Sequence, residues 1–256
     1  AYIIAPNYQA GKDSLAGFKR YFKGEIVDEV YAPLTSMDFA SDLAKIASTK
    51  PDVVFAFLPG GLGVNFVKQW SQAGLQGKHG FVEEMKFWES RLNVTTFDPS
   101  PWAGHVEQVL ARGIEIVTLR QLMEQGDAFR RPLYEAMVEM SRDVPRPDEY
   151  TPVPFEEWLK FNLENPNVLP DGYFLAMRDG DFAGVSNLWK APEERVLHVG
   201  LTATRRNYRR MGIALALKLK AIEYARQQGV HELRTGNETR NRPMLNINEA
   251  LGFVKQ

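Results

Sequence analysis

The fold is decided by one stretch of the sequence, Arg205-Arg206-Asn207-Tyr208-Arg209-Arg210-Met211-Gly212-Ile213-Ala214. Four arginines fall within its first six residues, and an amphipathic segment follows as far as Gln228. In that segment Leu215, Leu219 and Ile222 recur at i, i+4 and i+7, which predicts a helix that turns these side chains toward the core. Gly229 is the expected end of the helix, because glycine readily adopts the left-handed conformation found there.

The start of this helix is a candidate anion-binding site. The first N–H groups of a helix have no partner within it, and the helix dipole makes that end positive. A small residue such as Gly212 lets a phosphate approach the backbone closely, and the arginines can add charge-assisted hydrogen bonds. On charge alone, a solvated basic turn ahead of an ordinary helix explains the same residues equally well.

Composition excludes several classes of function. The 256 residues are 44% hydrophobic and 25% charged, which is typical of a globular protein with one large or two ordinary domains. The net charge of −1 provides no overall field that would favour nucleic acid. The lack of cysteine excludes disulfides, thiolate metal sites and a cysteine nucleophile. No signal peptide and no apolar run of membrane-spanning length is visible, so we expect a cytoplasmic protein without a membrane partner.

A continuous pattern of strands and helices begins at Ile114. Asp179-Gly180 marks a hairpin between two of the strands, because Asp-Gly suits the tight turns that join antiparallel strands. The expected strands cover residues 114–119, 173–178, 181–189, 196–204 and 232–236, and the expected helices cover 127–142, 155–164, 212–228 and 243–251.

This half of the chain resembles the GNAT-family N-acetyltransferases. Arg209 to Ala214 fits the family's R-x-x-G-x-A motif and follows a strand, as it does in that family. A second motif begins at Asn241 and ends in Leu251-Gly252-Phe253. The resemblance covers residues 114–256 and implies a mixed, mostly antiparallel sheet and acetyl-coenzyme A (acetyl-CoA) as cofactor.

The resemblance also implies roles for particular residues. The pyrophosphate would lie against the turn, backbone N–H groups of the preceding strand would polarise the thioester carbonyl, and the pantetheine arm would pass between that strand and the one at 232–236. The cofactor-binding residues expected on this basis are Leu201, Ala203, Arg209, Arg210, Gly212, Ala214 and Asn241.

Catalytic groups are harder to assign. Many family members carry a tyrosine that protonates the leaving thiolate, and Asn248 stands at that position here, although an amide cannot deliver a proton at neutral pH. His198 is a candidate base, predicted on one strand face with Gly200 and Thr202, but a lone strand histidine is more often structural. The four histidines show no ligand spacing, so we expect no metal site.

The leading functional hypothesis is therefore transfer of an acetyl group from acetyl-CoA to an unidentified primary amine. One alternative is a catalytically weak acyl-coenzyme A-binding module, which is favoured by Asn248 and by the expected C-terminal truncation of the GNAT-like region at Gln256. A second alternative is an amino-acid-binding fragment without enzymatic activity, and it rests on the first part of the chain.

Residues 1–78 resemble part of one lobe of a type I periplasmic binding protein of the Leu/Ile/Val class. The resemblance rests on Ile4-Ala5-Pro6-Asn7-Tyr8, Gly17-Phe18-Lys19 and Lys50-Pro51-Asp52-Val53-Val54-Phe55. Alternating strands and helices here predict a parallel sheet. Half of a cleft leaves the polar groups of a ligand unpaired, so we expect little binding by this lobe.

Residues 79–113 are the expected linker between these two parts. Within it, residues 79–92 resemble the end of an upstream GNAT domain, although a linker with a packed aromatic explains them equally well. The change of pattern predicts a fusion, natural or artificial, near residue 78.

Overall fold

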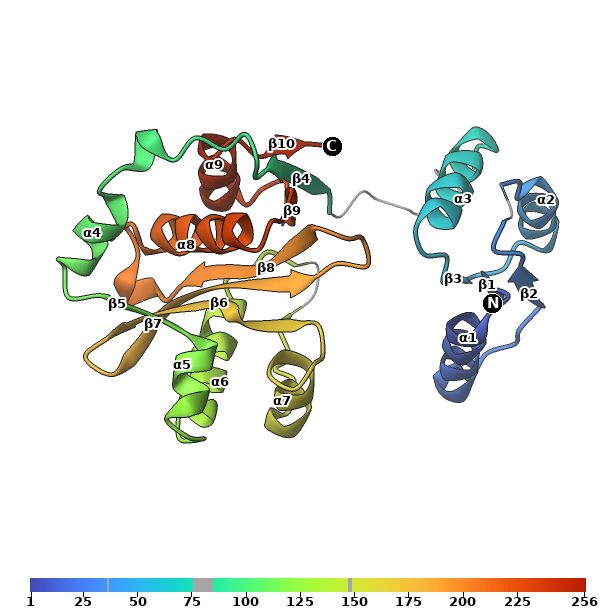
Figure 1. Cartoon of the computed structure of the whole chain (residues 1–256). Coiled ribbons are helices and arrows are strands. Elements are labelled where there is room, and N and C mark those ends of the chain that lie inside the picture. The colour runs from blue at the N-terminus through green and yellow to red at the C-terminus, as the bar shows by residue number, and fades with distance from the viewer. Residues whose placement is uncertain (36, 76–84, 147–148) are drawn as a thin grey trace. The chain divides into compact units, whose positions relative to one another are not determined.

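A computed structural model describes residues 1–35, 37–75, 85–146 and 149–256. The chain divides into two compact units, Ala1–Glu83 and Glu84–Gln256. Each unit has its own sheet (Figure 1). The fusion expected near residue 78 and the proposed origin of residues 79–92 stay predictions, and residues 79–84 lie outside the described ranges.

The first unit is a parallel α/β fold, as the sequence predicts. Its sheet has the order β2-β1-β3, and β1 pairs in parallel with both neighbours. Tyr2 and Ile4 face one helical layer while Ile3 and Ala5 face the other, because successive side chains of a strand alternate. The elements are β1 (Tyr2–Pro6), α1 (Gln9–Tyr21), β2 (Asp28–Ala32), α2 (Ala40–Thr49), β3 (Val54–Ala56) and α3 (Gly61–Gln72).

The second unit contains a seven-stranded sheet of order β10-β4-β9-β8-β7-β6-β5, and only β8 and β9 pair in parallel. Its elements are β4 (Phe87–Asn93), η1 (Ser100–Trp102), α4 (His105–Leu110), β5 (Glu115–Thr118), α5 (Leu119–Glu124), α6 (Arg130–Ser141), α7 (Phe155–Asn162), β6 (Val168–Arg178), β7 (Asp181–Lys190), β8 (Val196–Thr204), η2 (Arg206–Tyr208), α8 (Ile213–Gln227), β9 (Glu232–Glu238), α9 (Arg242–Ala250) and β10 (Val254–Lys255).

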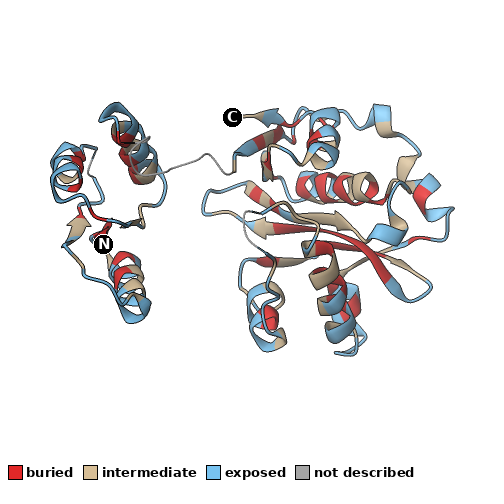
Figure 2. Ribbon diagram, turned by 180° about the vertical axis from the view of Figure 1, so that it is seen from behind, coloured by how far each residue is buried: buried red, intermediate tan, exposed pale blue. Residues whose placement is uncertain are grey.

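Helices cover both faces of this sheet. The core on one face lies beneath α8, and Phe253 after α9 belongs to the same cluster. The core on the other face is formed with α5, α6 and α7, and it includes the fully buried Tyr173. Figure 2 shows that the buried residues follow the middle of the sheet and the inner sides of these helices. The predicted mostly antiparallel sheet is confirmed.

Strand β4 is an internal strand of this sheet. It pairs with β9 along its whole length, from Phe87 opposite Glu238 to Asn93 opposite Glu232. On its other side it pairs with β10. Leu92 is buried in the core beneath α8. Residues 87–93 are therefore a structural part of the second unit, although the sequence suggested a linker here.

Helix α8 buries a wider face than the sequence predicts. Ile213, Leu217 and Ala221 are buried, whereas Leu215 and Leu219 are only partly buried. Lys218 is also buried, which periodicity alone does not suggest. The reason is that α8 packs against β6, β7 and β8 and also contacts α4.

Candidate active site

The first turn of α8 presents unpaired amide groups. Gly212 is the N-cap and makes no side-chain cap hydrogen bond. The first bond along the helix runs from the N–H of Ala216 to the oxygen of Gly212, at 3.0 Å. The amides of Ile213, Ala214 and Leu215 precede this bond, so they are the free donors of the helix start.

Helix α4 packs against the same turn from the carbonyl side. His105 Nε2 lies 3.0 Å from the oxygen of Gly212, and Arg112 donates to the oxygen of Met211 at 3.2 Å. A Cβ at position 212 would lie 2.9 Å from His105 Cε1, and φ there is 83°. Glycine is thus required both by its left-handed conformation and by the histidine. Both contacts involve carbonyl oxygens, so among the described residues neither occupies an amide at the start of α8.

The four arginines before this turn have different surroundings. Arg205 pairs with Glu139 of α6 at 2.6 Å. Both Nε and NH2 of Arg206 contact Asp143, and Arg209 contacts the same carboxylate. These contacts, first of all the bond from Arg206, lower the pKa of Asp143. Among the described residues Arg210 has no polar partner, is exposed, and adopts a left-handed φ of 61°.

The parallel strands β8 and β9 separate beside this turn. Their pairing covers only Val196 to His198 on β8 and Glu232 to Arg234 on β9. However, β8 continues to Thr204 and β9 to Glu238. The strands therefore diverge toward the end where α8 begins.

A β-bulge interrupts β8 at this point. Gly200 and Leu201 together stand opposite Asn187 of β7, because the register shifts by one residue there. Asn187 Oδ1 accepts the N–H of Leu201 at 2.9 Å. A Cβ at Gly200 would lie 2.4 Å from that oxygen, so only glycine fits.

The bulge reverses the faces of β8. Leu197 and Val199 pack in the core beneath α8, whereas Leu201 and Ala203 pack on the opposite side. Thr202, whose hydroxyl lies 2.9 Å from that of Ser186, faces α8. His198 stands opposite Trp189, which packs against the other core. The prediction that His198 and Thr202 share a face was wrong, because simple alternation takes no account of the extra residue.

The same register directs the backbone groups of β8. Arg205 donates its N–H to Ala183 at 2.9 Å, and alternation then turns the N–H groups of Ala203 and Leu201 toward β7 as well. The backbone N–H groups of Thr202 and Thr204 point the other way, toward the gap between β8 and β9. The thioester donors expected at Leu201 and Ala203 thus face away from that gap.

Two asparagines of the second motif lie at α9. Asn241 is the N-cap, and its side chain accepts the N–H of Met244 at 3.4 Å. Asn248 is 1% exposed and donates to Asn237 Oδ1 at 2.7 Å, while its own Oδ1 is buried without a partner. The Asn248 side chain is therefore a buried contact between α9 and β9.

Sequence reasoning missed Arg234, which lies beside His198 in the strand register. Its guanidinium bridges Glu232 at 2.6 Å and Glu193 at 2.7 Å, and it holds the pKa of Glu193 below its usual range. These charges lie on the sheet face that also carries His198. In the sequence, the only signal for this cluster was the alternation of the charged Glu232 and Arg234 with the apolar Leu233.

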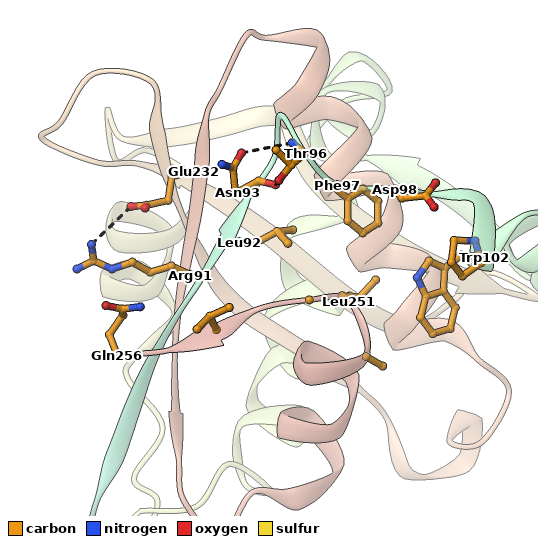
Figure 3. Close-up of a pocket in the computed structure, with 14 residues that line it drawn as sticks. Arg91, Leu92, Asn93, Thr96, Phe97, Asp98, Trp102, Glu232, Leu251 and Gln256 are labelled. Atoms are coloured by element: carbon orange, nitrogen blue, oxygen red, sulfur yellow. Dashed lines mark hydrogen bonds and ion pairs between the residues drawn. The ribbon is translucent and has the colours of Figure 1, made fainter.

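Two hollows open on the second unit. The larger, of about 600 Å³, lies among β4, β10 and the segment before η1, and includes Arg91, Phe97 and Trp102 (Figure 3). None of the predicted site residues lines it. The smaller, of about 270 Å³, lies on α6 and is lined by Tyr134, Glu135, Val138, Glu139, Arg142 and Pro152. Glu139 connects the smaller hollow to Arg205 and hence to the basic turn.

The described ranges contain neither a metal-binding cluster nor a membrane-spanning helix. No group of three or more histidine, aspartate or glutamate side chains is placed to hold a metal ion there. Within those ranges, no helix has the length and apolar character needed to cross a membrane.

Comparison with protein families agrees with the two sheets. Residues 131–253 match the model described as "Acetyltransferase (GNAT) family", and this range contains both motifs, the bulge and α8. Residues 131–253 form a GNAT domain. Residues 1–95 match the model described as "Periplasmic binding protein". That second match extends through β4, which belongs to the sheet of the GNAT domain.

Solved structures show the same fold for the GNAT domain. A GCN5-related N-acetyltransferase from Sphaerobacter thermophilus is 22% identical with a TM-score of 0.52, over 73% of this chain and 53% of that chain. A GCN5-related glucosamine N-acetyltransferase region in a fungal multi-domain GH3 β-N-acetylglucosaminidase has 12% identity and a TM-score of 0.54, over 89% of this chain and 28% of that chain. The present chain therefore spans about half of the first of these structures.

A solute-binding protein of an ABC transporter from Rhodopseudomonas palustris BisB5, solved with 3,4-dihydroxybenzoic acid, is 41% identical over 30% of this chain. The match covers 22% of that protein, with a TM-score of 0.29. A comparison with curated proteins found no match.

Proposed function

We propose that the second unit transfers an acetyl group from acetyl-CoA to a primary amine. The observation that carries this proposal is the uncapped first turn of α8, where three free amides follow a left-handed glycine next to arginine side chains. A diphosphate accepts hydrogen bonds from such amides and is favoured by the helix dipole. In this proposal Gly212 and Ala214 line the approach, and Arg209 and Arg210 provide the cations.

The arm of the coenzyme would lie in the gap between β8 and β9, with Asn241 at its edge. Backbone groups of Thr202 and Thr204, rather than those of Leu201 and Ala203, are the proposed donors and acceptors along that gap. His198 is the proposed base on the opposite face of the sheet. Asn248 is proposed to support β9 through Asn237, because its buried amide cannot deliver a proton to a thiolate.

For the acceptor we propose a cationic amine that binds at the smaller hollow. Tyr134 provides an aromatic face, and Glu135 provides a carboxylate that has no hydrogen-bond or ion-pair partner among the described residues. A protonated amine is attracted to both groups. It must lose a proton before attack, so a base such as His198 is required.

The binding part of the proposal is tested by calorimetry with acetyl-CoA. We expect a Kd in the micromolar range for the full chain. The double variant Arg209→Glu plus Gly212→Asp places two carboxylates at the turn and should abolish binding. Arg120→Glu is the control, because the side chain of Arg120 is equally exposed but pairs with Asp171 instead of lying at the turn. Unchanged binding by the double variant would refute the assigned site.

The catalytic part is tested by release of free thiol on addition of amines. Diamines and other cationic amines should react faster than neutral amides or hydroxyl compounds. The alternative is a non-catalytic acyl-coenzyme A-binding module, and the burial of Asn248 favours it. Tight binding without thiol release from any amine would support that alternative.

A further inference from the structure

The larger hollow of the second unit lies apart from the proposed transfer site. It is lined by Glu232, where β9 begins, and by residues of the segment 91–102. The gap between β8 and β9 opens instead toward Glu238, at the other end of β9. These two ends of the strand are about 20 Å apart, at about 3.3 Å per residue. The hollow thus belongs to a part of the domain to which the proposed function gives no role.

The apolar lining of this hollow includes two aromatic rings. Leu92 and Leu251 line it and are buried in the core beneath α8. Phe97 and Trp102 pack against the same core but are only partly buried. Among the described residues, neither ring has another ring or a cation as its partner. An aromatic or cationic partner from outside the domain can therefore bind to the rings within the hollow.

One carboxylate of the hollow has no cation. Asp98 Oδ1 accepts the N–H of Ser100 at 2.9 Å, and Asp98 forms no ion pair within the described ranges. The hydrogen bonds from Ser100, and after them the charge of Arg226, lower the pKa of Asp98. The carboxylate is therefore ionised at neutral pH. Arg226 itself donates to the main-chain oxygen of Phe97 at 3.0 Å and leaves the carboxylate without a salt bridge.

The charged groups at the other end of the hollow neutralise one another. Arg91 pairs with Glu89 at 2.7 Å, and Glu232 pairs with Arg234 at 2.6 Å. Figure 3 shows Arg91 and Glu232 at the end opposite to Asp98. The lining contains one arginine and two carboxylates, so its net charge is negative. The uncompensated charge lies at Asp98.

The segment that carries Phe97 and Asp98 is held by its own hydrogen bonds. Asn93 Oδ1 accepts the N–H of Thr95 at 3.0 Å and its hydroxyl at 2.6 Å. The bond from Arg226 fixes the backbone at Phe97 to helix α8. A lining that is already ordered reduces the conformational entropy lost when a ligand binds.

We propose that the larger hollow binds an organic cation with an apolar body, namely an arylalkyl ammonium ion. The charged end lies next to Asp98 and Trp102, because carboxylates and the faces of aromatic rings both attract cations. The apolar body covers Phe97 and Leu251. An anion would be repelled by Asp98, and a neutral apolar ligand would partly desolvate this carboxylate without pairing it. The inference is independent of the proposed function, since no step of acetyl transfer takes place here.

The experiment follows the indole N–H signal of Trp102 by NMR in the full chain labelled with nitrogen-15, and Trp102→Phe assigns this signal. Titration with 2-phenylethylammonium should move the signal with a Kd of about 0.1–1 mM. The uncharged 2-phenylethanol has a similar shape and should bind at least about tenfold more weakly. A local signal separates this hollow from the smaller one, where the proposed function places an amine.

Two variants test the assigned groups. Asp98→Asn keeps an acceptor for the N–H of Ser100 but removes the charge, so it should weaken binding of 2-phenylethylammonium about threefold to fivefold. Phe97→Leu keeps an apolar side chain without an aromatic face and should weaken binding by a similar factor. Asp179→Asn is the control and should bind as the unaltered chain does. It removes an exposed charge from the hairpin turn, where Asn-Gly fits as well as Asp-Gly.

Three results would overturn the inference. They are a Trp102 signal that does not move, equal affinity for 2-phenylethanol, and equal affinity of Asp98→Asn and the unaltered chain. Each would show that the hollow does not recognise a cation. None of them concerns coenzyme binding at α8, so the proposed function is decided separately by its own tests.

Discussion

The side-chain oxygen of Asn187 accepts the N–H of Leu201 at 2.9 Å, in a place where a main-chain carbonyl would act in a regular sheet. This bond holds the extra residue of β8 and turns Thr202 and Thr204 toward the gap next to β9. The bulge and the divergence of the two strands thus begin at the same level of the sheet. One asparagine on β7 therefore supports the geometry on which the proposed cofactor site depends.

Gly200→Ala tests this arrangement. The new Cβ would lie 2.4 Å from Asn187 Oδ1 and 2.5 Å from Trp189 Nε1, so both of these side chains must move. We expect the free energy of unfolding to fall by roughly 1–3 kcal/mol, measured by urea denaturation. Gly236→Ala on β9 is the control, because nothing lies within 4 Å of its added Cβ. Equal effects of the two substitutions would contradict the role assigned to Gly200.

Asp143→Asn tests whether an internal carboxylate competes with the coenzyme. Asp143 contacts the guanidinium groups of both Arg206 and Arg209, and it is only 20% exposed. Removing its charge while keeping its shape frees these cations for a phosphate, so we expect the Kd for coenzyme A to fall about threefold to tenfold. Calorimetry at fixed ionic strength gives the comparison. Asp171→Asn removes an equivalent ion pair elsewhere and should leave the Kd unchanged. Weaker binding by Asp143→Asn would mean that the carboxylate positions the arginines.

Gly212→Ala separates backbone conformation from packing. The residue has φ of 83°, and a left-handed alanine costs about 1–2 kcal/mol. Gly126→Ala carries a similar conformational cost, at φ of 99°, with nothing near its Cβ. We expect Gly212→Ala to lower thermal stability more than Gly126→Ala, because its Cβ also meets His105. Adding His105→Ala should recover part of that difference, and no recovery would mean that the ring does not restrict the turn.

Lys218 makes folding stability depend on pH. Its pKa falls from 10.5 in the unfolded chain to about 7 in the folded one, so between these values the unfolded chain binds more protons. Stability from this group therefore rises with pH across that window. The Lys218→Met variant lacks this dependence. From this effect we expect the free energy of unfolding of Lys218→Met to exceed that of the unaltered chain by on the order of 4 kcal/mol at pH 7. The difference should vanish near pH 10.5. Denaturant titrations at several pH values measure this difference, and a constant difference would show that Lys218 stays charged.

Much of the fold follows from the sequence. Apolar periodicity and turn residues predicted the strands on either side of Asp179-Gly180, whose φ angles of 53° and 83° are those of a tight hairpin. Helix α5 was missed, although Thr118 and Gln121 have the spacing of a capping box, which the structure forms. The apolar residues before Thr118 favoured a strand over residues 114–119, and this predicted strand included the capping residue itself.

The site was harder to derive, because it depends on contacts between distant segments. A single added residue at Gly200 reverses the face on which Leu201 lies, and no local pattern marks the insertion. The pairing of Asp143 with Arg206 joins segments 63 residues apart in the chain. Motif spacing located the turn at Gly212, whereas the partners of its arginines emerge only from tertiary packing.

The placement of β4 has a practical consequence for dividing the gene. Similarity to periplasmic binding proteins runs to residue 95, and a cut made there would assign β4 to the wrong fragment. A recombinant product starting at residue 96 would lack an interior strand, since β4 separates β9 from β10. Such a product would leave the edge of β9 bare and prone to self-association. Expression trials should therefore begin the GNAT fragment no later than residue 85.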